Sequence, residues 1–288
     1  MARATTSSIF AQTGRQIETT ARTALHSPWL ERLARAGYAA RGAVYALVGF
    51  LAVETALGAR SRPTDTRGAL QEIAGRSTAF LWLIAVGLAG YALWRIVQGF
   101  LDPEHKGNDL KGLAKRAGRI GSGLIYGGLA WAAMKIALGA HGAEGGGGGH
   151  TYQAWTAKLM SEPFGRWLVA AVGIGVIAGG LQQIRRGWTE RFRKEIRLQE
   201  MDETERKVAL NSGKLGLIAR GVVFLISGCF LVQAAWRFDP SQARGLGGAL
   251  AALAVQPHGA LLLGLVAVGL IAFGAYSILL ARYGRIVI

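Results

Sequence analysis

The sequence predicts an all-α integral membrane protein with six transmembrane helices, arranged as three helical hairpins related by a pseudo-threefold axis. Three observations support this fold class. The 288 residues are 51% hydrophobic and 17% charged, and the charged residues gather between long apolar stretches. Lysine and arginine are abundant in every second loop, as the topology of a multi-span membrane protein requires. A two-helix pattern also occurs three times along the chain.

Six windows are long and apolar enough to cross a bilayer. A hydrocarbon layer of about 30 Å takes about 20 helical residues at 1.5 Å per residue. The segments must be helical, because a strand or loop would leave backbone hydrogen-bonding groups unsatisfied in lipid. The expected spans are residues 37–58, 79–100, 118–139, 166–184, 216–236 and 258–280.

The basic residues outside these spans predict the orientation. Twenty Lys and Arg lie before the first span, after the last, or in the loops after spans two and four, against seven in the other three loops. The positive-inside rule therefore predicts that both termini are cytoplasmic. Residues 1–28 lack the apolar core of a signal peptide, so we expect a cytoplasmic tail, with an Arg-rich organelle presequence as the alternative.

The repeat is clearest in the first span of each copy. Two glycines five residues apart are followed three residues later by an aromatic ring, and small residues let helix backbones approach closely in lipid. The corresponding positions are Gly37, Gly118 and Gly216, then Gly42, Gly123 and Gly221, then Tyr45, Tyr126 and Phe224. The expected copies are residues 29–107, 108–184 and 208–288, with a charged cytoplasmic connector helix over 185–207 before the last copy.

The second halves of the copies also correspond. Pro163 and Pro257 precede spans four and six, and each is expected in the first turn of its helix. Short helices are expected before the even spans, near residues 68–74, 152–160 and 246–254, at the outer surface. Since each copy holds two spans, successive copies keep one direction and should be related by rotation about the membrane normal.

Glycine spacing predicts which copy packs most tightly. The middle copy carries a small-xxx-small pair in each span, Gly123 with Gly127 and Gly175 with Gly179. Such pairs favour close helix contacts in membranes. We therefore expect the middle copy to have the tightest packing.

These motifs resemble the domain-of-unknown-function 1206 family of bacterial membrane proteins. The resemblance covers nearly all of residues 29–288. It rests on the thrice-repeated Gly-x-x-x-x-Gly-x-x-aromatic element and on the Leu-x-x-x-Pro-x-Gly element, which the first copy lacks. It implies three repeated two-helix units in a bacterial inner (plasma) membrane, and it implies no activity.

One group of ionisable and polar residues lies in the outer halves of the odd spans. Glu54, Lys135 and Gln233 occupy corresponding positions in the three copies. An acid, a base and an amide around a common axis suit a small-solute or ion path. The alternative interpretation is a structural Glu54–Lys135 pair, with Lys135 extending its amine toward the interface.

A second group lies toward the cytoplasmic side. Arg41 and Arg220 correspond in the first and last copies, with Ser122 in the middle copy, and Arg95 sits near the inner end of the second span. These arginines are candidates for contacts with anionic lipid headgroups or an anionic ligand. Ordinary anchoring at the inner membrane boundary is the alternative.

The connector combines charges of both signs with an apolar stripe. Trp188, Phe192 and Ile196 recur every four residues, the spacing of one helix face. This pattern predicts that the connector helix rests on anionic lipid or docks another membrane protein. A solvated charged helix is the alternative.

Composition argues against several other classes. The net charge of +16 follows the loop alternation and has no nucleic-acid motif with it, and the single Cys229 and five unclustered histidines predict no metal site and no cofactor. No nucleophile with a base is apparent, so we expect no enzyme. The sequence favours a noncatalytic structural or accessory membrane protein, with a channel or transporter lined by Glu54, Lys135 and Gln233 as the alternative.

Overall fold

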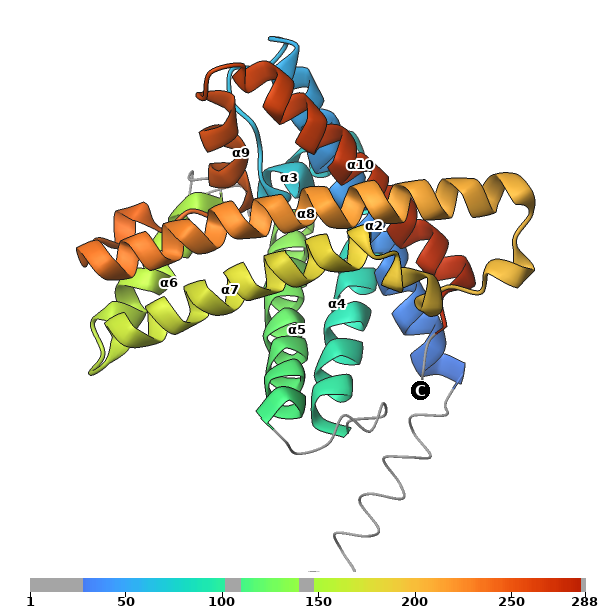
Figure 1. Cartoon of the computed structure of the whole chain (residues 1–288), viewed down its shortest axis with the longest axis horizontal. Coiled ribbons are helices and arrows are strands. Elements are labelled where there is room, and N and C mark those ends of the chain that lie inside the picture. The colour runs from blue at the N-terminus through green and yellow to red at the C-terminus, as the bar shows by residue number, and fades with distance from the viewer. Residues whose placement is uncertain (1–27, 102–109, 140–147, 286–288) are drawn as a thin grey trace, which may run out of the picture.

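The computed structural model describes residues 28–101, 110–139 and 148–285, which are helical apart from loops and one isolated bridge between Ile196 and Gly284 (Figure 1). Six helices are long and apolar enough to cross a membrane, and each overlaps one of the expected spans. The six-span prediction is therefore confirmed at the level of helices. They are α2 (Pro28–Ala56), α4 (Thr78–Leu101), α5 (Leu110–Ala137), α7 (Gly165–Trp188), α8 (Glu203–Arg237) and α10 (Gly259–Tyr283).

Three short helices precede the even spans, as expected: α3 (Thr66–Arg76), α6 (Gly148–Met160) and α9 (Leu246–Ala254). They do more than cover a surface, because Leu70 of α3 and Leu250 of α9 are fully buried in the main apolar core. The expected place of the prolines is wrong. The helices begin at Gly165 and Gly259, and the residue between each proline and glycine, Phe164 or His258, has a left-handed backbone that forms the turn.

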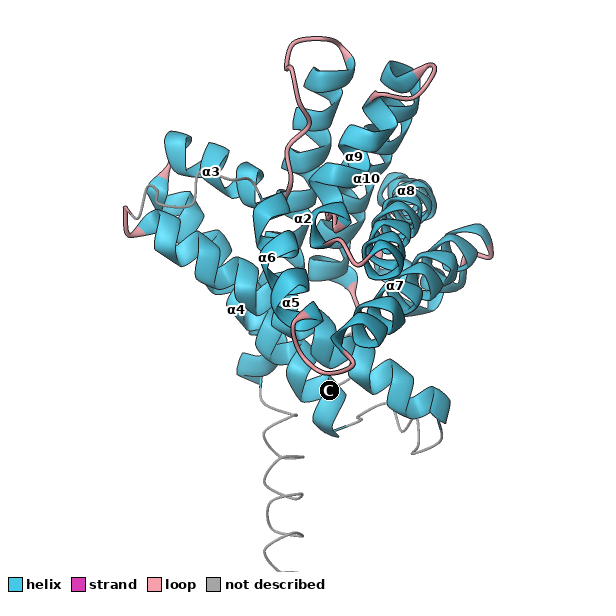
Figure 2. Ribbon diagram, turned by 90° about the vertical axis from the view of Figure 1, so that its left-hand side faces the viewer, coloured by secondary structure: helices cyan, strands magenta, loops and turns pink. Residues whose placement is uncertain are grey.

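The tightest packing joins helices of neighbouring copies. In Figure 1, α7 and α8 run together across the view, α4 and α5 run down it, and α2 and α10 lie diagonally. Figure 2 shows α7 and α8 side by side from a second direction. We call α2/α10, α4/α5 and α7/α8 the three pairs. Each pair combines an even span with the odd span of the next copy, and the last copy pairs with the first.

The second glycine of the repeated motif closes each pair. A Cβ atom added to Gly42 would lie 2.8 Å from the carbonyl oxygen of Gly274, and one added to Gly221 would lie 2.8 Å from that of Gly180. Gly123 makes the corresponding approach to Ala92, at 2.9 Å. These distances require glycine, because real Cβ atoms do not come so close to backbone. The repeated motif therefore marks a close contact between helices of neighbouring copies.

Packing within a copy differs among the three copies. We call the contact between the two long helices of one copy its seam. In the last copy, a Cβ on Gly216 would lie 2.5 Å from the Cα atom of Phe273, and in the first copy one on Gly87 would lie 2.6 Å from Ala40 Cβ. Both seams are therefore closed.

The seam of the middle copy, between α5 and α7, is open. Four glycines line it, and a Cβ on any of them would meet no atom of the described residues within 4 Å: Gly118, Gly121, Gly175 and Gly179. The expectation that the middle copy packs most tightly is wrong. Gly123 and Gly127 face α4 instead, and a Cβ on Gly175 or Gly179 would meet no described atom within 4 Å.

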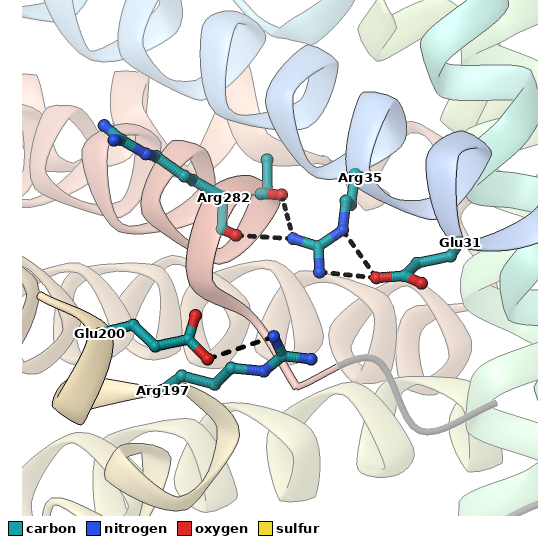
Figure 3. Close-up of polar contacts among 6 residues, drawn as sticks. Glu31, Arg35, Arg197, Glu200 and Arg282 are labelled. Atoms are coloured by element: carbon teal, nitrogen blue, oxygen red, sulfur yellow. Dashed lines mark hydrogen bonds and ion pairs between the residues drawn. The ribbon is translucent and has the colours of Figure 1, made fainter. Parts of the chain in front are cut away.

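The first and last long helices are also joined by polar contacts near their predicted cytoplasmic ends. Arg35 of α2 pairs with Glu31 at 2.6 Å and donates from Nη1 to the carbonyl oxygens of Ala281 and Arg282, at 2.8 and 2.6 Å (Figure 3). A guanidinium satisfies carbonyls that a helix C-terminus leaves free. This contact fixes α10 against the start of α2.

The expected continuous connector helix over 185–207 is wrong. The chain leaves the helix after Trp188, turns at Glu190 with φ 53°, and forms two short 3₁₀ helices, Arg191–Glu195 and Leu198–Glu200. Phe192 and Ile196 point inward and are buried, so only Trp188 of the expected stripe is exposed. Burial of these two side chains against α8 and α10 overrides the helical spacing.

Candidate anion site

A cluster of one buried arginine, two partly buried arginines and several aromatic rings lies where the three pairs meet. Arg41 of α2 is only 4% exposed. It donates from Nη1 to the phenol oxygen of Tyr91 at 2.6 Å and from Nη2 to Ser277 at 3.1 Å. Its Nε atom is buried and has no hydrogen-bond partner among the described residues. One donor of a fully ionised side chain is therefore left unused inside the bundle.

Arg95 shares the same phenol. It follows Tyr91 by one turn of α4 and donates from Nε to the Tyr91 oxygen at 2.8 Å. It also donates to Gln98 at 3.3 Å. Two guanidinium groups thus donate to one phenol oxygen.

Arg220 of α8 completes the group. Its Nε donates to Tyr45 at 3.1 Å and its Nη1 to Gln183 of α7 at 2.8 Å. Its guanidinium carbon lies 4.9 Å from the ring centre of Phe273, and that of Arg41 lies 5.1 Å from the same ring. We call Arg41, Arg95 and Arg220 the arginine cluster.

Aromatic rings form the wall of the cluster. Tyr91 makes edge contacts with Tyr38 and Tyr126, with ring centres 5.2 and 4.7 Å apart, and Tyr45 makes one with Phe273 at 4.9 Å. Cations are attracted to such ring faces, but rings do not cancel a full charge. In the described part of the chain, no carboxylate forms an ion pair with any member of the cluster.

The arrangement favours binding of an anion. A buried charge without a countercharge is costly, and a bound anion removes this cost. Guanidinium groups present planar arrays of donors that match phosphate and carboxylate oxygens. The arginine cluster therefore has the charge and the free donor that an oxyanion would need.

The repeat explains how the cluster forms. Arg41 and Arg220 hold the same position in their copies, and Arg95, Gln183 and Ser277 share another. Arg41 donates to Ser277 and Arg220 donates to Gln183, so each arginine contacts the second of these positions in the preceding copy, across its helix pair. The three arginines expected from the sequence are thus brought together, and the phenols of Tyr38 and Tyr91 are site residues that sequence reasoning missed.

The candidate polar layer of Glu54, Lys135 and Gln233 is not assembled in this way. The carboxylate of Glu54 pairs with Arg60 at 2.8 Å, and Arg60 also pairs with Glu72 of α3 at 2.9 Å. Lys135 is exposed, with its amine 5.9 Å from the ring centre of Trp131. Gln233 is partly buried on α8. Within the described residues, no ion pair joins Glu54 to Lys135.

The Glu72–Arg60 contact predicts a pH-dependent contribution to stability. The hydrogen bond from Arg60 lowers the pKa of Glu72 below its ordinary value of 4.5. A lowered pKa adds stability above the unfolded-state value, and this stability is lost as pH falls through the folded-state value. We expect Glu72→Gln to lower the melting temperature at pH 7, with the difference from wild type shrinking below pH 4.5.

Thermal unfolding of the detergent-solubilised protein across this pH range measures the effect. Glu200→Gln serves as the control, because its contact with Arg197 is exposed and 3.3 Å long (Figure 3). Exposed pairs contribute little. A Glu72→Gln deficit that stayed constant down to pH 3 would contradict the prediction.

The fold and the cluster define a class: a helical protein with six helices long and apolar enough to cross a membrane, three two-helix units and an arginine cluster inside the bundle. The family model described as Domain of Unknown Function (DUF1206) matches this chain three times, over residues 36–102, 117–190 and 215–284. The chain belongs to the DUF1206 family.

A relative in Bacillus subtilis (strain 168), described as uncharacterized protein YxxB, has a similar sequence throughout. It is 38% identical over 258 residues, which cover 89% of this chain and 92% of the relative. No solved structure matches the chain. The two chains are thus alike along nearly their full lengths, beyond any single motif.

Proposed function

We propose that this protein is a noncatalytic, accessory membrane protein that binds an anion at the arginine cluster. One observation carries the proposal: three arginines meet inside the bundle without a paired carboxylate among the described residues, and Arg41 Nε is buried without a partner. Phosphate is a suitable anion, either free or in a lipid headgroup, because its oxygens accept several guanidinium donors.

We further infer that the copies are related by rotation about the membrane normal, with both termini on the cytoplasmic side of a plasma membrane. The corresponding glycine contacts of the three pairs support the rotation. The excess of basic residues on one side supports the orientation. In this orientation, the cluster lies in the cytoplasmic half of the bilayer.

Ligand-dependent stability tests the proposal. A ligand that binds only the folded state stabilises it by about 2.7 kcal/mol at 100 times its dissociation constant. We expect inorganic phosphate, compared with chloride at equal ionic strength, to raise the melting temperature of the protein in neutral detergent by several degrees. Arg220→Gln should lose this shift.

Arg206→Gln is the matched control, because Arg206 is an exposed arginine on the same helix. It makes the same change of charge outside the cluster and should keep the shift. Equal phosphate stabilisation in all three proteins would refute binding at the cluster. An absence of stabilisation in the wild type by phosphate and by phosphatidylglycerol would refute it as well.

A further inference from the structure

The open seam of the middle copy lies between α5 and α7, and both helices contribute side chains to the wall of the arginine cluster. Resting on the proposed anion binding, we infer that the ligand is an anionic phospholipid, whose phosphate binds the cluster and whose acyl chain lies between α5 and α7.

The three seams are built from corresponding residues but differ in packing. In the first copy, Gly37 packs on Tyr91 and Gly87 on Ala40. In the last copy, Gly216 packs on Phe273 and Gly269 on Ala219. The middle copy has glycine at all four matching positions, Gly118, Gly179, Gly175 and Gly121. The seam with the smallest residues is therefore the one that is open.

The middle copy lacks the large side chains that fill the other two seams. Tyr91 and Phe273 are large rings at the position that Gly179 holds in the middle copy. Both rings are buried and fill the space behind their closed seams. Gly179 leaves that space without a ring, and a Cβ added there would meet no described atom within 4 Å.

The opening leads to the cluster from both of its sides. On α7, Gly179 is one turn before Gln183, which accepts a hydrogen bond from Arg220. On α5, Ser122 is one turn before Tyr126, whose ring contacts that of Tyr91. Tyr91 in turn accepts from Arg95. Each helix that borders the seam thus contributes a side chain to the wall of the arginine cluster.

Exposure of the arginines agrees with access from this side. Arg41, between α2, α4 and α10, is buried, whereas Arg95 and Arg220 are only partly buried. Arg220 is the member whose partner, Gln183, lies on α7 beside the seam. The free Nε of Arg41 supplies an unused donor deeper in the cluster.

The chemistry of the seam selects an amphiphile over a small ion. Its surface is glycine backbone with the Ser122 hydroxyl at the inner end, and exposed apolar side chains such as Ile125 and Val172 lie on the same two helices. An acyl chain fits such a surface, while a free phosphate finds few donors on it. The positively charged arginine cluster lies toward the inner end, which matches a molecule with one charged head and an apolar tail.

The depth of the cluster also suits a phospholipid headgroup region. Arg95 lies six residues before Leu101, the last residue of α4. At 1.5 Å per residue this is about 9 Å from the helix end. Arginine side chains near helix ends extend toward the interface, where lipid phosphates lie.

Photocrosslinking in nanodiscs tests the inference. The probe is phosphatidylglycerol with a diazirine on one acyl chain, in a phosphatidylcholine background, and labelled peptides are identified by mass spectrometry. We expect labelling concentrated on residues 118–128 and 168–179, reduced at least fivefold by excess unlabelled phosphatidylglycerol and little changed by phosphatidylcholine. Labelling spread evenly over the exposed faces of all six long helices would overturn the inference.

Filling the seam provides the second arm. Gly121→Leu with Gly175→Leu places side chains in open space, so the protein should fold, and labelling of the seam should fall at least fivefold. Cys229→Leu is the control, because its position corresponds to the exposed Phe50 and Trp131 of the other copies. Unchanged labelling in the filled variant would overturn the lipid route.

The two proposals fail in different ways. If the filled variant loses lipid labelling and keeps the melting-temperature shift with inorganic phosphate, both proposals stand. If phosphate stabilises the protein through Arg220 but phosphatidylglycerol does not compete for the seam, the anion site stands and the lipid route fails. If neither anion binds, the proposed function itself fails.

Discussion

Gly216→Leu is expected to destabilise the packing of the last copy strongly. A Cβ at residue 216 would lie 2.5 Å from both the Cα and the backbone nitrogen of Phe273. Helix backbone cannot yield as a flexible side chain can, so α8 and α10 would have to separate. Overpacking of a tight core costs about 1–3 kcal/mol, occasionally more, and we expect the upper end here.

The matching glycine of the middle copy offers an internal control. Gly118→Leu makes the same substitution at the corresponding position, where the added side chain meets no described atom within 4 Å. We expect Gly118→Leu to change the free energy of unfolding by no more than about 0.5 kcal/mol, as exposed substitutions generally do. Fluorescence-detected size exclusion and tryptophan unfolding in detergent compare the two. Equal behaviour would show that the middle seam is closed in solution.

Arg41→Met is expected to stabilise the anion-free protein and to remove its response to phosphate. Arg41 and Arg95 donate to one phenol oxygen, at 2.6 and 2.8 Å, so the two positively charged donor groups repel each other with their nitrogens at most 5.4 Å apart. At an effective dielectric constant of about 20 this repulsion is about 3 kcal/mol. Replacing a buried charge by an apolar side chain is often stabilising, and we expect a gain of about 1–2 kcal/mol.

The sign of the effect should reverse when the anion is present. Saturating phosphate or phosphatidylglycerol should stabilise the wild type above the Arg41→Met protein, which lacks one of its three binding charges. Arg35→Met on the same helix is the control. Its charge is compensated by Glu31 and by carbonyls of α10, so its loss should destabilise the protein with or without anion. A destabilised Arg41→Met protein in anion-free buffer would contradict the idea that the cluster carries excess charge.

Hydropathy and the internal repeat predict much of the fold. The six long helices follow from apolar length, and the equivalence of Gly42, Gly123 and Gly221 marks positions that do form close contacts. The repeat does not show which helix each of these glycines contacts. Each of these glycines packs on the preceding copy, because a motif records the need for a close approach and not which helix makes it.

The same limit explains the wrong expectation for the packing of the middle copy. Gly175 and Gly179 have the spacing of a helix contact, yet the large residues that fill the other seams, Tyr91 and Phe273, have no counterpart in the middle copy. The prediction of a continuous connector helix was wrong for a different reason. Phe192 gains more by burial against Gly213 and Tyr276 than by continuing a helix past Glu190.

The candidate site was predicted in part. Arg41, Arg95 and Arg220 could be selected because ionisable side chains within apolar spans are costly and need a reason to be there. Their aromatic surroundings could have been found from Tyr45 and Tyr126, which belong to the repeated motif. Tyr91 carried no such signal, since its counterparts are Gly179 and Phe273. The contacts of Arg60 with Glu54 and Glu72 could not be predicted, because Arg60 lies in a loop and hydrophobic periodicity does not predict the path of a loop.

The pairing of α2 with α10 has a consequence for biogenesis. A ribosome makes the first span long before its partner, since 227 residues separate the end of α2 from the end of α10. At about 5–20 residues per second, the wait is tens of seconds. During that time, no helix of the nascent chain covers the glycine face of α2. Any molecule that covers this face in the bilayer must leave before α10 can pack against α2.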